Sequence, residues 1–174
     1  MSLPMPSPNR VLLAIDESEA SRRALRYVCA IALPNADMQV VLCHVVSPLP
    51  PDLLESPGAD DAEEERELTE ELRAAQADWS THRSGWGERL LERARAFLTR
   101  AGVPPPRVEL RLVDPGDSHG GKLVEHLLEE ADGARCRTIV VGRSAFSRLK
   151  ELVRTHVADD LVRRSQGYTV WVVE

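Results

Sequence analysis

The chain has 174 residues, 43% of them hydrophobic, which is enough to form the core of a single domain. Its formal net charge of −6 argues against a surface that binds nucleic acid or acidic membranes. No apolar run approaches the ~20 residues of a membrane-spanning helix, and the first ten residues lack the apolar centre of a secretory signal. We therefore expect a cytoplasmic protein.

The first part of the chain predicts a strand, a helix and a second strand. Residues 1–9 are rich in proline and serine and predict a flexible tail before one domain over residues 10–174. Arg10–Asp16 is nearly all apolar, as expected of a central strand in a parallel sheet. Ser18 is placed to cap a helix that runs to about Leu33, and Met38–Val46 is the second apolar strand.

The middle of the chain is dominated by a loop and a long helical stretch. Residues 47–61 contain four prolines and one glycine, which predicts a mobile loop. From about Ala62 the sequence is dense in Glu, Arg, Leu and Ala, which favour a helix. Two glycines and three hydroxyl residues in Ser80–Gly87 predict an interruption, after which Glu88–Arg100 resumes the helix.

The last part continues the alternation of strands and helices. Arg107–Val113 alternates polar and apolar residues, as an edge strand does. Ile139–Val141 is a short β-branched run that predicts a strand buried on both faces. A helix ending at Gly133 precedes it, a helix ending at Arg164 follows it, and Tyr168–Val173 is the fifth strand.

This order predicts an α/β fold with three layers, in which helices cover both faces of an open five-stranded parallel sheet. The carboxyl ends of parallel strands meet at one edge, where such sheets bind ligands. Asp16, Val45 and Gly142 all lie at carboxyl ends, so we expect them to converge on one crevice. A strand, a glycine and a following helix start, as after Ile139–Val141, are the parts of an anion site.

Cysteine and histidine patterns favour structural roles. Cys29, Cys43 and Cys136 are odd in number, far apart and in apolar settings, which predicts reduced thiols in the core. His44 lies in an apolar strand and is interpreted as a hydrogen-bonded core histidine. The other histidines lack metal-ligand spacing, and no Gly-x-Ser-x-Gly or Walker lysine motif occurs. We therefore predict neither a protein-held metal nor a catalytic residue.

Five segments, in this order, resemble the universal stress protein family. The resemblance implies an open sheet with strand order 3-2-1-4-5, a homodimer and, in one branch of the family, ATP binding. The matching segments are Val11–Ser21, Val41–Val45, Asp114–Asp117, Thr138–Ser144 and Val170–Val173.

The resemblance implies an adenine-nucleotide site at the carboxyl edge, where the family's Asp and a backbone segment contact adenine. The family's phosphate loop, written Gly-x-x-Gly, nine residues, Gly-Ser or Gly-Thr, here reads Gly142-Arg-Ser-Ala145, nine residues, Thr155-His156. From the residues alone, Asp16 is equally a carboxylate that caps the first helix or pairs locally, and Thr155 can instead cap the last helix. The implied nucleotide-binding residues are Ala14, Ile15, Asp16, Val45, Val141, Gly142, Ser144, Ala145, Thr155, His156 and Val157.

The altered loop leads to three functional hypotheses. Glycine permits positive φ and close phosphate approach, whereas Ala145 and Thr155 resist both. The first hypothesis is therefore a non-catalytic stress-response module whose crevice is degenerate or binds something smaller than ATP. The second is an ATP- or AMP-binding switch or slow ATPase, with nucleotide-associated magnesium, in which Arg143, Arg148, Lys150 and Arg154 contact the phosphates. The third is a scaffold whose charged helical region binds an unidentified protein.

The fifth strand also predicts self-association. Tyr168–Val173 is apolar and would leave an open sheet edge in a monomer. Pairing of this strand with a second copy would cover the edge. We therefore expect a homodimer formed through this strand.

Overall fold

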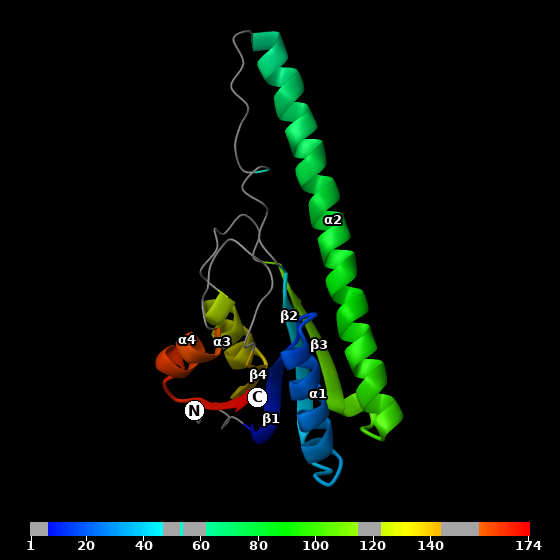
Figure 1. The fold of residues 1–174 in the computed structure, drawn as a ribbon, viewed down its shortest axis with the longest axis vertical. Helices are drawn as coiled ribbons and strands as arrows, with labels where there is room; N and C mark the ends of the chain where they lie inside the picture. Colours follow the sequence, from blue (N-terminus) through cyan, green and yellow to red (C-terminus); the bar gives the residue numbers. More distant parts are fainter. Residues whose placement is uncertain (1–6, 47–52, 54–61, 115–122, 144–156) are drawn as a thin grey trace, which may run out of the picture.

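A computed structural model gives the fold, and it describes residues 7–46, 53, 62–114, 123–143 and 157–174. These residues form five strands, four α-helices and one 3-10 turn, in the alternating order that the sequence predicts (Figure 1). The elements are β1 (Ser7–Ala14), α1 (Glu19–Ala32), β2 (Gln39–Val45), α2 (Ala62–Ala101), η2 (Pro105–Arg107), β3 (Val108–Val113), α3 (Leu123–Gly133), β4 (Cys136–Gly142), α4 (Val157–Arg164) and β5 (Thr169–Val173).

The five strands form one parallel sheet in the order β3-β2-β1-β4-β5, which confirms the predicted fold class and strand order. β1 lies at the centre, where Leu13 pairs with Leu42 of β2 on one side and Val140 of β4 on the other. β3 and β5 are the edges, and the side chains of β3 are mostly half-buried, as its polar alternation predicts. All strands run the same way, so their carboxyl ends share one edge.

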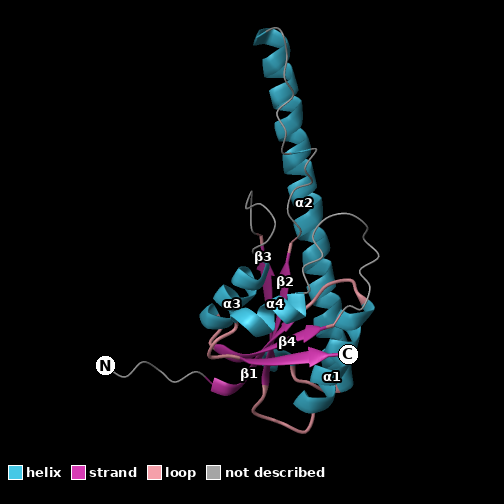
Figure 2. Cartoon of the chain, turned by 60° about the vertical axis from the view of Figure 1, so that its left-hand side comes forward, coloured by secondary structure: helices cyan, strands magenta, loops and turns pink. Residues whose placement is uncertain are grey.

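Side chains alternate between the two faces of the sheet and form two cores. Leu13 and Val140 face α1 and α2, whereas Leu12 and Ile139 face α3 and α4. Figure 2 shows these two helix pairs on opposite sides of the sheet. The predicted burial of the β4 apolar run on both faces is therefore confirmed, because Val141 and Ile139 enter one core while Val140 enters the other.

The predicted interruption at Ser80–Gly87 is wrong, because α2 is a continuous helix across it. Gly87 lies against the sheet, where an added Cβ would come within 2.8 Å of the His44 ring and closer still to Leu112. Trp86 packs edge-on against His44, with ring centroids 5.4 Å apart. Glycine costs a helix only about 1 kcal/mol relative to alanine. Packing on β2 and β3 outweighs this cost, and α2 continues past the end of the sheet (Figure 1).

Other boundaries differ in smaller ways. β1 begins at Ser7 rather than Arg10, so its first residues lie within the predicted tail of residues 1–9. The rest of that tail and the predicted loop at residues 47–61, apart from Leu53, lie outside the described residues. The assignment of one domain to residues 10–174 stays a prediction.

The end of β4 touches the first turn of α1. A Cβ added at Gly142 would collide with the Ala20 carbonyl and lie 2.8 Å from the Ser21 nitrogen. Because these are backbone atoms, they cannot turn aside as a flexible side chain does. Only glycine allows this approach.

We therefore predict that Gly142→Ala lowers the free energy of unfolding by roughly 1–3 kcal/mol, the usual cost of overpacking. Urea denaturation measures it. Gly133→Ala is the matched control, since nothing lies within 4 Å of a Cβ there. The control should be neutral or stabilising by less than about 1 kcal/mol. If Gly142→Ala proved as stable as Gly133→Ala, the close contact of Gly142 with the backbone of Ala20 would be contradicted.

The three cysteines are buried and unpaired, as predicted for reduced core thiols. Burial raises the pKa of the Cys43 thiol to about 12 and that of Cys136 to about 11. An exposed thiol in the unfolded chain ionises at about pH 8.5. The unfolded state therefore loses these protons at a lower pH than the native state does. The free energy of unfolding should fall as the pH rises from about 8.5 toward the native pKa values.

We expect Cys43 and Cys136 to resist iodoacetamide at pH 8 in the native protein and to react readily in urea, because only the thiolate is nucleophilic. Mass spectrometry of tryptic peptides measures the labelling of each residue. Rapid labelling of either cysteine in the native protein would contradict the burial of that side chain.

Candidate functional site

The segment after β1 forms one side of the candidate site. Ala14 ends β1, Ile15 is buried, and Asp16 is exposed at the carboxyl edge. The Ile15 amide donates to the Cys43 carbonyl at 2.8 Å, so pairing with β2 continues one residue past the strand. This pairing fixes the position from which Asp16 leaves the sheet.

Asp16 takes part in the turn that begins α1. Its Oδ1 accepts from the Ser18 amide at 2.8 Å, and its own amide donates to Ser21 Oγ at 3.0 Å. Ser18 caps the helix as predicted, because its Oγ accepts from the Ser21 amide at 3.0 Å. Of the two local roles that the sequence allowed for Asp16, local pairing is confirmed, whereas the cap of α1 is Ser18. The local pairing uses one carboxylate oxygen.

The end of β2 is tied to the end of β1 through His44. The Nδ1 of His44 lies 2.7 Å from the Ile15 carbonyl oxygen. A carbonyl only accepts, so Nδ1 carries the hydrogen. His44 is 6% exposed and packs on Trp86, which confirms its interpretation as a hydrogen-bonded core histidine. Val45 follows it at the carboxyl end, as predicted.

The end of β4 forms the third part of the candidate site. Val141 is buried and faces α3 and α4, whereas Gly142 lies against Ala20 in the first turn of α1. Since α1 starts directly after Asp16, this contact brings the ends of β1 and β4 together on the same edge. Val45 ends β2 on the other side of β1. The predicted residues Ala14, Ile15, Asp16, Val45, Val141 and Gly142 thus all lie at this edge.

The predicted phosphate loop lies largely outside the described residues. Ser144, Ala145, Thr155 and His156 are not described, and Val157 is the first residue of α4. Among the four suggested cationic contacts, only Arg143 is described, and it forms salt bridges with Asp159 at 3.1 Å and Glu174 at 2.9 Å. Two carboxylates are therefore already paired with one of the four cationic side chains that the ATP hypothesis uses.

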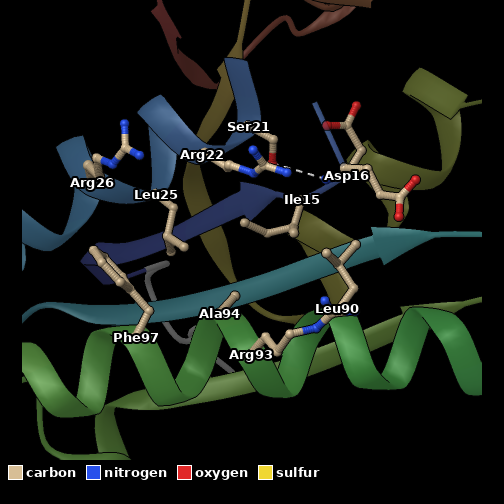
Figure 3. A pocket seen from close by; sticks show the side chains of 11 residues that line it. Ile15, Asp16, Ser21, Arg22, Leu25, Arg26, Leu90, Arg93, Ala94 and Phe97 are labelled. Atoms are coloured by element: carbon tan, nitrogen blue, oxygen red, sulfur yellow. Dashed lines mark hydrogen bonds between the residues drawn. The ribbon is translucent and has the colours of Figure 1, made fainter. Parts of the chain in front are cut away.

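Sequence reasoning missed a pocket of about 260 Å³ between α1 and α2 (Figure 3). It meets the candidate site at one end, through Ile15, Asp16, Glu17 and Ser21. The helical spacing of the residues on each wall was visible in the sequence, but nothing in the sequence showed that these two helices lie side by side. The other lining residues are Arg22, Leu25 and Arg26 of α1 and Leu90, Arg93, Ala94 and Phe97 of α2.

Neither a metal centre nor a membrane span is found in the part of the chain that the structure covers. Within the described ranges, no group of three or more His, Cys, Asp or Glu side chains is placed to hold a metal ion. No described helix combines the length and the apolar character needed to cross a bilayer.

Comparison with known proteins finds structures of the same fold. No curated protein matches the chain in sequence. A solved structure from the universal stress protein family of Burkholderia pseudomallei is 24% identical, with a TM-score of 0.57, over 95% of this chain and 96% of its own. A universal stress protein in complex with cAMP is 20% identical, with a TM-score of 0.58, over 95% of each chain.

A universal stress protein from Archaeoglobus fulgidus in complex with dAMP is 18% identical, with a TM-score of 0.52, over 98% of this chain and all of its own. At these identities the structures establish a shared fold. The family model described as "Universal stress protein family" matches residues 8–174, which is nearly the whole chain. On that match the chain belongs to the universal stress protein family.

Proposed function

We propose that this protein is a non-catalytic regulatory module of the stress response that binds an adenine nucleotide with fewer phosphates than ATP. The observation that carries the proposal is the convergence of the β1, β2 and β4 ends around Asp16. Ligands of open parallel sheets bind at such an edge. The regulatory rather than catalytic role rests on the absence from the sequence of a hydrolase serine motif and a Walker lysine motif.

Asp16 supports recognition of the nucleoside. Its side chain is exposed, and one oxygen accepts from Ser18 while the other has no hydrogen-bond partner among the described residues. A carboxylate oxygen accepts hydrogen bonds from ribose hydroxyls or from the adenine amino group. The local turn holds this carboxylate at the edge before a ligand arrives, which reduces the entropy cost of binding.

The phosphate side supports a smaller ligand than ATP. Ala145, Thr155 and His156 replace the residues of the family's loop, and Arg143 is already paired with two carboxylates. The related structures in complex with cAMP and dAMP, both nucleotides with a single phosphate, agree with this proposal.

Titration calorimetry with AMP, cAMP and ATP tests the proposal. We expect AMP or cAMP to bind in the micromolar range and ATP to bind no tighter, because Ala145 and Thr155 resist close approach of a phosphate and Arg143 is already paired with two carboxylates. Asp16→Asn keeps the acceptor for Ser18 but removes the charge, and should weaken binding about tenfold.

Asp37→Asn is the matched control, because it makes the same change on an exposed residue before β2, at the opposite edge of the sheet. It should leave affinity unchanged. ATP binding much more tightly than AMP would favour the switch or ATPase hypothesis. No binding of any of the three would show that the crevice is degenerate.

We also propose that the protein is a cytoplasmic homodimer that pairs through β5. β5 is a sheet edge whose side chains are mostly half-buried and apolar. Trp171 and the 46% exposed Tyr27 form an edge-on aromatic pair beside it, with centroids 6.1 Å apart. An apolar edge strand of this kind favours pairing with a second copy.

Light scattering after gel filtration tests the dimer. Val172→Glu adds one like charge from each copy to the paired strands and should yield a monomer. Trp79→Glu is the control, because Trp79 is 41% exposed on α2, and α2 packs on β2 and β3 rather than on β5. A dimer that survives Val172→Glu, or a monomeric wild-type protein, would contradict pairing through β5.

A further inference from the structure

The pocket between α1 and α2 is separate from the candidate nucleotide site over most of its length. It runs along the two helices on one face of the sheet, with Asp16 at one end and Phe97 toward the other (Figure 3). Leu25 projects into it from α1, and Arg93 and Leu90 lie on the α2 wall. A ligand in this pocket would touch the nucleotide site only at its Asp16 end.

The pocket exposes apolar surface that a ligand could cover. Ile15 and Ala94 are buried beneath it, whereas Leu25, Leu90 and Phe97 line it while only half-buried. Covering apolar surface is favourable, and an aromatic ring prefers to pack on another ring or on aliphatic side chains. The lining therefore fits a ligand with a flat apolar body. Its volume of about 260 Å³ limits that body to a small one.

The charged rim of the pocket includes Arg93, whose guanidinium forms no salt bridge within the described part of the chain. Arg22 and Arg26 lie 2.8 Å and 3.8 Å from the two carboxylate oxygens of Glu19. Arg93 differs, because its Nε donates to the Arg89 carbonyl at 3.3 Å and it forms no salt bridge with any residue that the structure describes. Its two terminal amino groups are therefore available to an anion. A guanidinium fork matches a carboxylate with two parallel hydrogen bonds.

The Asp16 end of the pocket limits the charge of the ligand. Asp16 and Glu17 line that end, so a doubly charged phosphate would be repelled more than a singly charged carboxylate. We propose that the α1–α2 pocket binds a small aromatic carboxylate, with its ring between Leu25 and Phe97 and its carboxylate on Arg93. This site is additional to the proposed nucleotide site and does not depend on it.

Calorimetric titration with 2-naphthoate tests this proposal, and 2-naphthamide serves as the neutral probe of nearly the same shape. We expect saturable binding of naphthoate, at least about tenfold weaker binding of the amide, and a loss of affinity with added salt. Amide chemical shifts in NMR spectra of the wild-type protein should change around Leu25, Ala94 and Phe97. Equal affinity for both probes, or shift changes confined to other regions, would overturn the proposal.

Arg93→Gln should weaken naphthoate binding about tenfold, because it removes the guanidinium but keeps much of the side-chain stem. Arg95→Gln is the matched control, since Arg95 lies on the same helix, pairs with Glu92 and does not line the pocket. The same loss in both variants, or no loss in Arg93→Gln, would overturn the role of Arg93.

The nucleotide proposal fails separately from this one. Asp16→Asn is expected to weaken nucleotide binding but to keep or strengthen naphthoate binding, because it removes a negative charge from the pocket. A parallel loss of both ligands in Asp16→Asn would show that they share one site and would overturn the separate pocket.

Discussion

The contact between the end of β4 and the first turn of α1 positions the other parts of the candidate site. Gly142 lies so close to the Ala20 carbonyl that no side chain fits between them. α1 begins just after Asp16, so the contact sets the distance between the β1 turn and the β4 end. A parallel sheet brings strand ends to one edge, but it does not by itself bring them into contact. Gly142, which has no side chain, allows the end of β4 to contact the first turn of α1.

The buried histidine extends the same constraint to the opposite side of β1. His44 holds the Ile15 carbonyl through Nδ1 and packs on Trp86 of α2. The position of α2 is therefore coupled to the turn that carries Asp16. Because α2 also forms one wall of the new pocket, the two proposed sites are built on a shared rigid core. Each lies on a different surface of it, one at the sheet edge and one between helices.

Charge is distributed unevenly over this acidic chain. The net charge is −6, yet three arginines line the α1–α2 pocket. At the carboxyl edge, by contrast, Arg143 is paired with Asp159 and Glu174, and the Asp16 carboxylate is exposed. This charge pattern is the basis of the proposal that the edge binds a nucleotide with fewer phosphates than ATP. Membership of the universal stress protein family accounts for the fold.

Local periodicity and the rules of parallel sheets were enough to predict the five strands, which of them are central and which are edges, the Ser18 cap and the meeting of strand ends at one edge. The prediction failed at Ser80–Gly87, because the local cost of glycine was considered without the packing of Gly87 against His44. The continuity of α2, and the fact that Leu25 and Phe97 line one pocket, could be seen only in the folded protein. Both depend on contacts between segments that are distant in sequence, which no local pattern encodes.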